Sequence, residues 1–133
     1  MTSQVPHPTR PPLRRILAVE DEADLRAVLD LCLREVGQFE VLICSSGEEA
    51  LAQAQAFAPD LFLLDVMMPG LDGPGTLQRL RAQGCGAPAF FLTAKVQAGD
   101  VAELTAVGAA AVVPKPFDPM GLPDELRARW AAL

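Results

Sequence analysis

The sequence predicts a single α/β domain built on a parallel β-sheet that helices cover on both faces. Short apolar runs, each of the length of a buried strand, recur five times along the 133-residue chain. A stretch with the three- and four-residue spacing of an amphipathic helix follows each run. Five alternations of strand and helix, with no internal repeat, require parallel strands that are buried on both faces.

The first unit of this alternation follows a Pro-rich beginning. Residues 1–12 hold four prolines with polar spacers and are interpreted as a disordered or polyproline-like tail, so the domain is expected to span residues 13–133. The first strand is expected over residues 16–19. A helix begins at Ala23, and Gly37 is expected to end it. Its predicted apolar face consists of Leu25, Val28, Leu29, Cys32 and Val36.

The second and third units have clear helix starts. A strand is expected over residues 39–44, and Ser46 with Glu49 has the spacing of a capping box for the next helix. The apolar stripe of that helix is Ala50, Leu51, Ala54 and Phe57. The third strand, Leu61 to Leu64, ends at Asp65. Gly73-Pro74 opens the third helix, in which Leu77 and Leu80 face inward, and Gly84 and Gly86 end it.

The fourth and fifth units complete the sheet. A strand over residues 89–92 ends in Thr93, and a helix over residues 97–107 is closed by Gly108. The fifth strand, residues 110–113, is followed by Pro114, which cannot donate to a sheet; this strand therefore lies at an edge or ends there. Asp118-Pro119 starts the last segment, whose helical face carries Leu122, Leu126 and Trp130. Trp130 is either a core residue or part of a docking surface.

Composition excludes several classes of function. The net charge of −6 and the pI near 4.6 argue against binding to nucleic acid or to an anionic membrane by bulk electrostatics. No apolar stretch is long enough for a transmembrane helix, and the beginning lacks the apolar region of a secretory signal. Cys32, Cys44 and Cys85 have no paired spacing, so they are expected to be reduced thiols of a cytoplasmic protein.

The reactive side chains all fall where a strand ends. Glu20 and Asp21 follow the first strand, Asp65 ends the third, and Thr93 and Lys115 follow the fourth and fifth. In a doubly wound sheet the carboxyl ends of the strands form one crevice. We therefore expect these residues to converge on a single site, although each of them taken alone has an ordinary structural explanation.

The chemistry of this set favours a divalent cation and a phosphoryl group. Three carboxylates at close range repel one another, which raises and couples their pKa values unless a cation joins them. An all-oxygen set suits Mg²⁺, and His7 lies too deep in the tail to indicate zinc. Lys115 and the Thr93 hydroxyl can bind phosphoryl oxygens. Asp65 is then a plausible nucleophile that forms an acyl phosphate.

From about Arg14 to Trp130 the chain resembles the receiver domain of two-component response regulators. The matching motifs are Val19-Glu20-Asp21-Glu22, Leu64-Asp65-Val66-Met67-Met68-Pro69-Gly70-Leu71-Asp72-Gly73, Leu92-Thr93-Ala94-Lys95 and Lys115-Pro116-Phe117. The second motif is highly specific, and the four together cover nearly the whole domain. The resemblance implies a flavodoxin-like fold with five helices and strand order 2-1-3-4-5.

The resemblance also implies roles for the residues at the strand ends. Asp65 accepts a phosphoryl group from a phosphohistidine on a sensor histidine kinase or a phosphotransfer protein. Glu20, Asp21 and Asp65 bind Mg²⁺ together with the backbone carbonyl of Met67, and Thr93 and Lys115 contact the phosphoryl oxygens. The Lys115-Pro116 bond corresponds to a cis peptide of the family.

Two positions depart from the usual pattern of the family. Glu20 stands where Asp is common, a change that should preserve metal binding. Val112 occupies the position, three residues before Lys115, where many receivers have Tyr or Phe. Because a β-branched side chain is stiff and small, we hypothesise that signalling uses the loop and helix after Thr93.

The lifetime of the phosphorylated state is expected to depend on two neighbours. Met67 offers no polar group to orient a hydrolytic water, and Lys95 could shield the phosphoryl group, so slow hydrolysis is predicted. The alternative for Lys95 is an ordinary solvated surface residue.

The leading hypothesis is a stand-alone receiver whose interaction surface changes on phosphorylation. The resemblance implies a docking or dimerisation face on the fourth helix, fifth strand and fifth helix. One alternative is a phosphatase or phosphotransferase with an Asp nucleophile, but such enzymes place a second Asp where this chain has Met67. Another is a phosphate-independent interaction protein of the same fold, which would not need Asp65 or Lys115.

Overall fold

Five parallel strands form a single sheet in the computed structural model, which describes residues 10–133. The order is β2-β1-β3-β4-β5, as the resemblance implied. The strands are β1 (Arg15–Val19), β2 (Glu40–Cys44), β3 (Leu61–Asp65), β4 (Ala89–Thr93) and β5 (Ala111–Pro114). The interpretation of residues 1–12 as a disordered tail falls mostly outside the described residues.

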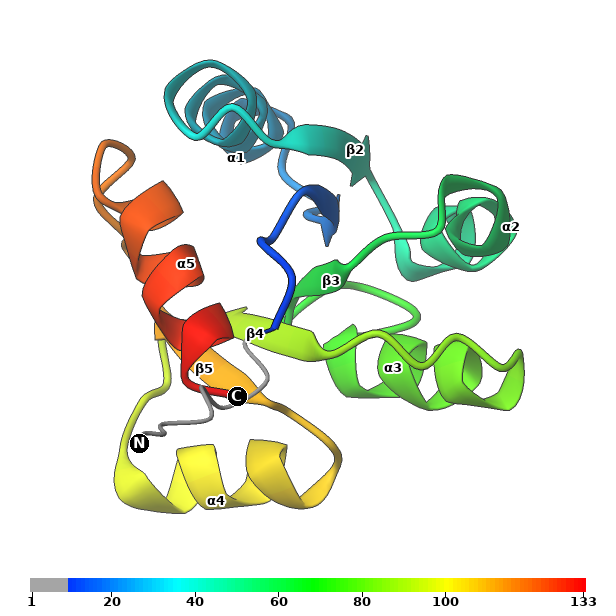
Figure 1. Ribbon diagram of the computed structural model, residues 1–133. Helices are drawn as coiled ribbons and strands as arrows, with labels where there is room; N and C mark the ends of the chain where they lie inside the picture. Colours follow the sequence, from blue (N-terminus) through cyan, green and yellow to red (C-terminus); the bar gives the residue numbers. More distant parts are fainter. Residues whose placement is uncertain (1–9) are drawn as a thin grey trace, which may run out of the picture.

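Helices cover both faces of the sheet (Figure 1). They are α1 (Ala23–Asp30), continued by η1 (Leu31–Val36), then α2 (Gly47–Phe57), α3 (Gly73–Ala82), α4 (Ala98–Ala106) and α5 (Leu122–Ala131). The pair α1 and α5 lies on one face, and α2, α3 and α4 lie on the other. The predicted doubly wound architecture is confirmed.

Each face of the sheet has its own hydrophobic core. The central strand β3 is buried along its whole length and alternates its side chains between the two cores, so that Leu61 and Leu63 join one and Phe62 and Leu64 the other. The predicted face of α5 is confirmed, because Leu122, Leu126 and Trp130 all belong to the core under α1 and α5. A parallel strand covered on both sides has no polar face, which explains the continuous apolar runs in the sequence.

The predicted apolar face of the first helix is partly wrong. Leu29 and Cys32 are buried as expected, but Val28 and Val36 are more than a third exposed, and Leu33 is buried in their place. The cause is the π-helical segment η1, in which the Gly37 N–H donates to the carbonyl of Cys32, five residues back. The wider turn shifts the inward face by one position, and the helix still ends at Gly37.

Two other local predictions need small corrections. Ser46 caps α2 as expected by accepting from the Glu49 N–H (3.1 Å), but the Glu49 carboxylate reaches Ser45 and not Ser46. The last helix begins at Leu122, not at Asp118, because residues 118–121 first form a turn in which the Asp118 carbonyl accepts from the Gly121 and Leu122 N–H groups.

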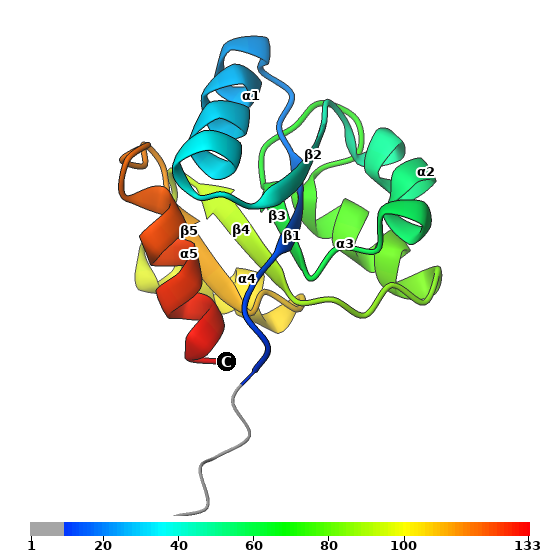
Figure 2. The ribbon, with the colours of Figure 1, turned by 45° about the horizontal axis from the view of Figure 1, so that its top comes forward.

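The carboxyl ends of the strands meet at one end of the molecule, the upper end in Figure 2. The opposite end holds the beginning of β1 and the end of α5, where the Trp130 indole N–H donates to the Pro11 carbonyl (2.8 Å). β5 is an edge strand, and Pro114 is its last residue, as predicted. Among the helices of residues 10–133, none combines the length and apolar character that crossing a bilayer requires.

Candidate functional site

Glu20 and Asp21 extend from the end of β1 into the crevice. The Glu20 side chain is fully buried, although it carries a carboxyl group. One of its oxygens accepts from the Glu22 N–H (3.1 Å), and the other accepts from Lys115 Nζ (3.2 Å). A buried carboxylate needs such partners, because its transfer from water is costly.

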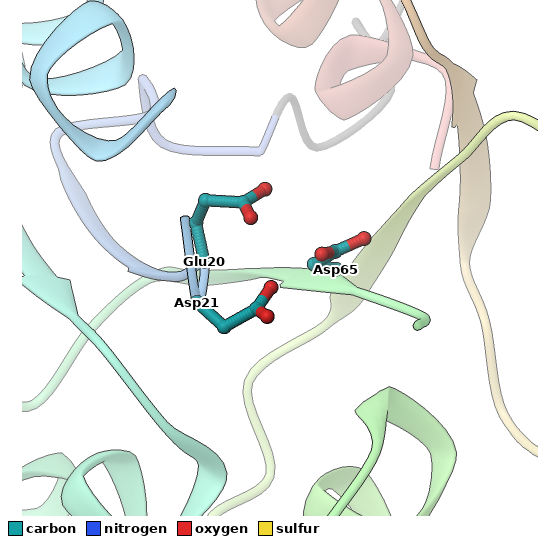
Figure 3. Close-up of side chains that lie close together, drawn as sticks. All are labelled: Glu20, Asp21 and Asp65. Atoms are coloured by element: carbon teal, nitrogen blue, oxygen red, sulfur yellow. The ribbon is translucent and has the colours of Figure 1, made fainter. Parts of the chain in front are cut away.

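Asp65 is the last residue of β3 and is 3% exposed. Lys115, which follows β5, donates to its Oδ1 at 3.2 Å and so bridges the carboxylates of Asp65 and Glu20. Figure 3 shows the side chains of Glu20 and Asp21 reaching from β1 toward Asp65 on the neighbouring strand. The predicted convergence of Glu20, Asp65 and Lys115, which are far apart in the sequence, is therefore present in the fold.

The three carboxylates form a donor set that a small hard cation can bind. One oxygen from each of Glu20, Asp21 and Asp65 lies within 4.8 Å of the others. The set contains oxygen ligands alone, which suits Mg²⁺ better than metals such as zinc or copper that favour thiolate or imidazole ligands. The predicted contribution of the Met67 carbonyl is not tested by these side-chain positions, and it stays a prediction.

Burial and charge act in opposite directions on the titration of this cluster. Burial raises the pKa of Asp65 and of Glu20, against the lowering effect of Lys115 on both. The carboxylates of Asp65 and Glu20 raise the pKa of Lys115, although burial alone would lower it. The expected rise in pKa thus occurs for Asp65 and Glu20, but burial rather than mutual repulsion is its main cause.

Thr93 completes the site from the end of β4. Its side chain is buried, and its hydroxyl oxygen accepts from the backbone N–H of Lys95 (3.0 Å). The Thr93 carbonyl accepts from the Lys115 N–H (2.8 Å), which joins the ends of β4 and β5. The Lys115-Pro116 bond is cis, as the resemblance implied. The Lys95 side chain is exposed.

A cleft of about 480 Å³ opens above these residues. Asp65, Thr93 and Lys115 lie on its wall with Asp21 and Met67, whose side chain is 66% exposed. The apolar part of the cleft was not predicted from the sequence; it is formed by Leu25 and Val28 of α1 and by Pro116, Phe117 and Pro119 after β5. The signal for it was an apolar segment directly after Lys115.

Arg26 of α1 is a further residue near the site whose role was not predicted from the sequence. Its guanidinium donates to the carbonyls of Glu20 (3.0 Å) and Asp21 (2.8 Å). A basic residue one turn after an acidic loop is a signal that could have indicated this contact.

Val112 lies in the core between the sheet and α2–α4, and it is 9% exposed. The two buried thiols, Cys32 and Cys44, are free, and burial raises their pKa values to about 11 and about 12. Neither thiol belongs to the cleft.

A parallel sheet of this order, with an acidic crevice, a Thr and a Lys at its strand ends, defines a class of phosphoryl-accepting signalling domains. The family model of the response regulator receiver domain matches residues 16–127. The chain belongs to this family of two-component signalling domains.

Relatives and solved structures agree with the family. The chain is 40% identical over 116 residues to the DNA-binding response regulator MtrA of Mycobacterium tuberculosis. The aligned residues make up 87% of this chain and 50% of that protein. The chain is 41% identical over 114 residues to the probable transcriptional regulator ycf27 of Pyropia yezoensis. The aligned residues make up 86% of this chain and 46% of the relative. The chain thus spans about half the length of these curated relatives.

Among solved structures, the chemotaxis protein CheY4 of Vibrio cholerae superimposes with a TM-score of 0.80 at 32% identity. That comparison covers 87% of this chain and 98% of the other. A putative response regulator from Chloroflexus aurantiacus gives a TM-score of 0.76 at 32% identity, with coverage of 90% and 98%. These structures match nearly their whole length, so the described chain contains a complete receiver fold.

Proposed function

We propose that this receiver accepts a phosphoryl group on Asp65 in a Mg²⁺-dependent reaction and changes its interaction surface in response. The observation that carries the proposal is the environment of Asp65. This carboxylate ends the central strand, is almost fully buried, is bonded to Lys115, and lies beside two further carboxylates at the wall of an open cleft. A merely structural Asp at a strand end does not need such surroundings.

The reaction is a transfer between a nitrogen and an oxygen. An Asp65 carboxylate oxygen attacks phosphorus in line with the phosphorus–nitrogen bond of a phosphohistidine; this bond breaks, and the imidazole leaves with a proton from solvent. Lys115 would neutralise charge on the phosphoryl oxygens, and the Thr93 hydroxyl would donate to one of them; the bond of Lys115 to Asp65 and the position of both residues on the cleft wall support these roles. Positioning and charge neutralisation supply most of the rate in phosphoryl transfer.

Glu20, Asp21 and Asp65 would hold the Mg²⁺, with the Met67 carbonyl as a further ligand. When bound, the cation would neutralise the carboxylate cluster and the incoming phosphoryl group. The all-oxygen donor set within 4.8 Å supports this assignment. Glu20, longer than Asp by one methylene, reaches the same cluster, which supports the expectation that this departure preserves metal binding.

The proposed phosphodonor is a histidine kinase or a histidine phosphotransfer protein. A donor imidazole must enter the cleft over Asp65, and the apolar side chains of Leu25, Val28 and Phe117 line the approach. Val28 is 37% exposed in the isolated chain. An apolar rim around a charged reaction centre favours a protein donor that buries this surface on docking.

The first experiment is intact mass after incubation with Mg²⁺ and acetyl phosphate. We expect one added phosphoryl group on the wild type and none on Asp65→Asn. The matched control is Asp72→Asn, which alters the next carboxylate along the chain; Asn can still cap α3 as Asp72 does for the Gly75 N–H (2.8 Å). An adduct on Asp65→Asn, or its loss in Asp72→Asn, would contradict the assignment.

The same samples distinguish a receiver from the two alternatives, an enzyme with an Asp nucleophile and a phosphate-independent interaction module. Turnover of a simple phosphomonoester would favour an enzyme with an Asp nucleophile over a signalling receiver. No adduct, either with acetyl phosphate or with a phosphohistidine donor, in a protein that binds Mg²⁺ would favour a phosphate-independent interaction module.

The proposal also covers the lifetime of the acyl phosphate and the segment that carries the conformational response. Met67 and Lys95 are exposed beside the site, which supports the expectation that they slow hydrolysis of the acyl phosphate. The response is carried by the loop and helix after Thr93, residues 94–106, because Val112 lacks the size to act as a rotating switch. α4 has no buried residue, which supports it as the moving element.

The output surface is the face formed by α4, β5 and α5. A shallow groove of about 470 Å³ lies there, lined by Val96, Val101 and Thr105 on one side and by Ala111, Pro114 and Arg129 on the other. Val96 is 45% exposed. Such a half-apolar surface supports docking of a target or of a second copy of the chain.

A further inference from the structure

Arg26 binds the backbone of the two residues that supply carboxylates from β1. One nitrogen of its guanidinium, Nη1, donates to the Glu20 carbonyl at 3.0 Å and to the Asp21 carbonyl at 2.8 Å. The Arg26 backbone N–H also donates to the Glu22 carbonyl (2.9 Å). Three consecutive carbonyls of the loop between β1 and α1 are thus tied to one residue of the helix.

The loop needs such an anchor because regular pairing stops there. The Glu20 N–H still bonds to the Cys44 carbonyl of β2, but the carbonyls of Glu20 and Asp21 lie beyond the ladder of β1 and β2. The carboxylates of these two residues lie close to that of Asp65, so repulsion favours opening of the loop when no cation is present. A guanidinium on the carbonyls opposes this opening and occupies no carboxylate oxygen.

Arg26 contacts the backbone of Glu20 and Asp21 and is not itself one of the proposed metal ligands. It is absent from the residues that line the cleft, whereas Asp21 and Asp65 face it. Its side chain is half-buried. An outer partner of this kind sets the orientation of the ligands and thereby the affinity for the metal.

We propose that Arg26 is a positioning residue, which holds the Glu20–Asp21 loop in the geometry that binds Mg²⁺ and thereby supports phosphorylation of Asp65. The inference rests on the proposed function for the identity of the metal and of the reaction. The tethering of the loop itself does not depend on either.

The test compares Arg26→Ala with Arg34→Ala. Arg34 is a matched control, because it lies in the same helical stretch and donates to a backbone carbonyl, but to that of Val41 in β2 (2.9 Å) and not to one of the acidic loop. Calorimetric titration with Mg²⁺ should give a dissociation constant about tenfold higher for Arg26→Ala, the scale seen for outer partners of metal ligands. The control should match the wild type.

Phosphorylation by acetyl phosphate adds a kinetic readout. Arg26→Ala should be slow at low Mg²⁺ and should approach the wild-type rate when Mg²⁺ is saturating, because positioning acts through metal affinity. Arg26→Lys keeps the positive charge but has a shorter side chain without the guanidinium, and it should remain impaired. Full rescue by Lys would show that charge alone suffices and would overturn the positioning role.

A measurement on the metal-free protein separates this inference from the proposed function. ¹⁵N relaxation should show lower backbone order at Asp21 and Glu22 in Arg26→Ala than in the wild type and in Arg34→Ala. Unchanged order together with unchanged Mg²⁺ affinity would overturn the inference. If the wild type binds no Mg²⁺, the proposed function fails, whereas loop order still decides whether Arg26 positions the loop.

Discussion

Asp65, the proposed phosphoryl acceptor, combines two demands that conflict at the level of a single residue. A nucleophilic carboxylate must be ionised, yet burial raises the pKa of Asp65 and also that of Glu20. Lys115 offsets part of this cost through its bonds to both carboxylates. In the metal-free protein the ionised form of these buried carboxyl groups is therefore unfavourable, and a bound cation would stabilise it.

The unfavourable ionisation of these groups has a measurable effect on stability. The raised pKa values mean that these carboxyl groups take up protons at a higher pH in the folded state than in the unfolded chain. The free energy of unfolding should therefore increase, through this site, as the pH falls from neutral toward about 4. Asp65→Asn removes one such charge, while Lys115 keeps Glu20 as its partner. We expect this variant to be more stable than the wild type at neutral pH in chelator, with an advantage that shrinks on acidification.

Denaturant unfolding of both proteins over this pH range, with and without Mg²⁺, checks the prediction. Added Mg²⁺ should stabilise the wild type more than the variant. A wild type that is more stable than Asp65→Asn at neutral pH without metal would contradict the expected sign of the effect.

The lifetime of the acyl phosphate is a second property of individual residues. Replacing Met67 by Asn and Lys95 by Ser places short polar groups beside the cleft, where they can orient a water molecule. We expect hydrolysis to accelerate by about tenfold, which corresponds to about 1.4 kcal/mol in activation free energy. Decay of the phosphorylated mass after removal of the donor measures this rate, and an unchanged rate rules out the account.

At the scale of elements, the three helices on one face of the sheet differ in how tightly they are packed. α2 and α3 approach so closely that a Cβ built on Gly47 would lie 2.1 Å from the Thr76 hydroxyl oxygen and 2.9 Å from a Leu71 methyl carbon. Thr76 is fully buried and donates to the Asp72 carbonyl, so it cannot move freely. By contrast, α4 buries none of its side chains completely.

A matched pair of glycine variants tests this difference in packing. Gly47→Ala should destabilise the protein by about 2 kcal/mol, the usual cost of overpacking a tight contact. Gly99→Ala, in the first turn of α4, meets no atom within 4 Å and should be neutral or stabilising by up to about 1 kcal/mol. Denaturant unfolding measures both, and equal effects would contradict the contrast between the helices.

The mobility of α4 should appear on phosphorylation. We expect backbone amide resonances of residues 94–106 to shift more than those of α2 or α3 when acetyl phosphate and Mg²⁺ are added, because few core contacts oppose movement of this segment. Asp65→Asn under the same conditions is the control. Unchanged resonances in this segment of a protein that is shown to be phosphorylated would exclude it as the carrier of the signal.

At the scale of the whole molecule, the proposed reaction centre and the proposed output face lie on different parts of one domain. The cleft opens at the carboxyl ends of the strands, whereas the groove between α4, β5 and α5 flanks the edge strand. Lys115 and Thr93 lie next to both regions, because they stand at the ends of β5 and β4. A change at Asp65 can therefore reach the output face through two strand ends.

Self-association through that face is the prediction at this scale. Sedimentation velocity of the phosphorylated protein should show a larger dimer fraction than that of the unphosphorylated protein. Val96→Glu places a charge in the exposed part of the groove and should reduce dimerisation without loss of phosphorylation. A phosphorylated wild type that stays monomeric at high concentration would reject homodimerisation and favour a different protein as the target.

The alternation of strands and helices could be predicted from the sequence, as could the positions of Glu20, Asp21, Asp65, Thr93 and Lys115 at the strand ends. This was possible because strands buried on both faces must be apolar throughout, so a polar residue marks where each strand leaves the sheet. The motifs around these residues also indicated the family and, through it, the strand order.

The contacts between elements could not be predicted from the sequence and became clear from the fold. The π-helical segment after Asp30 moved the buried face of the first helix, although the apolar spacing favoured a regular α-helix. The contacts of Arg26 with the acidic loop and the bridge of Lys115 between two carboxylates depend on which partners the fold brings within hydrogen-bonding distance. Local periodicity carries no information on such distances, because they are set by the packing of distant segments.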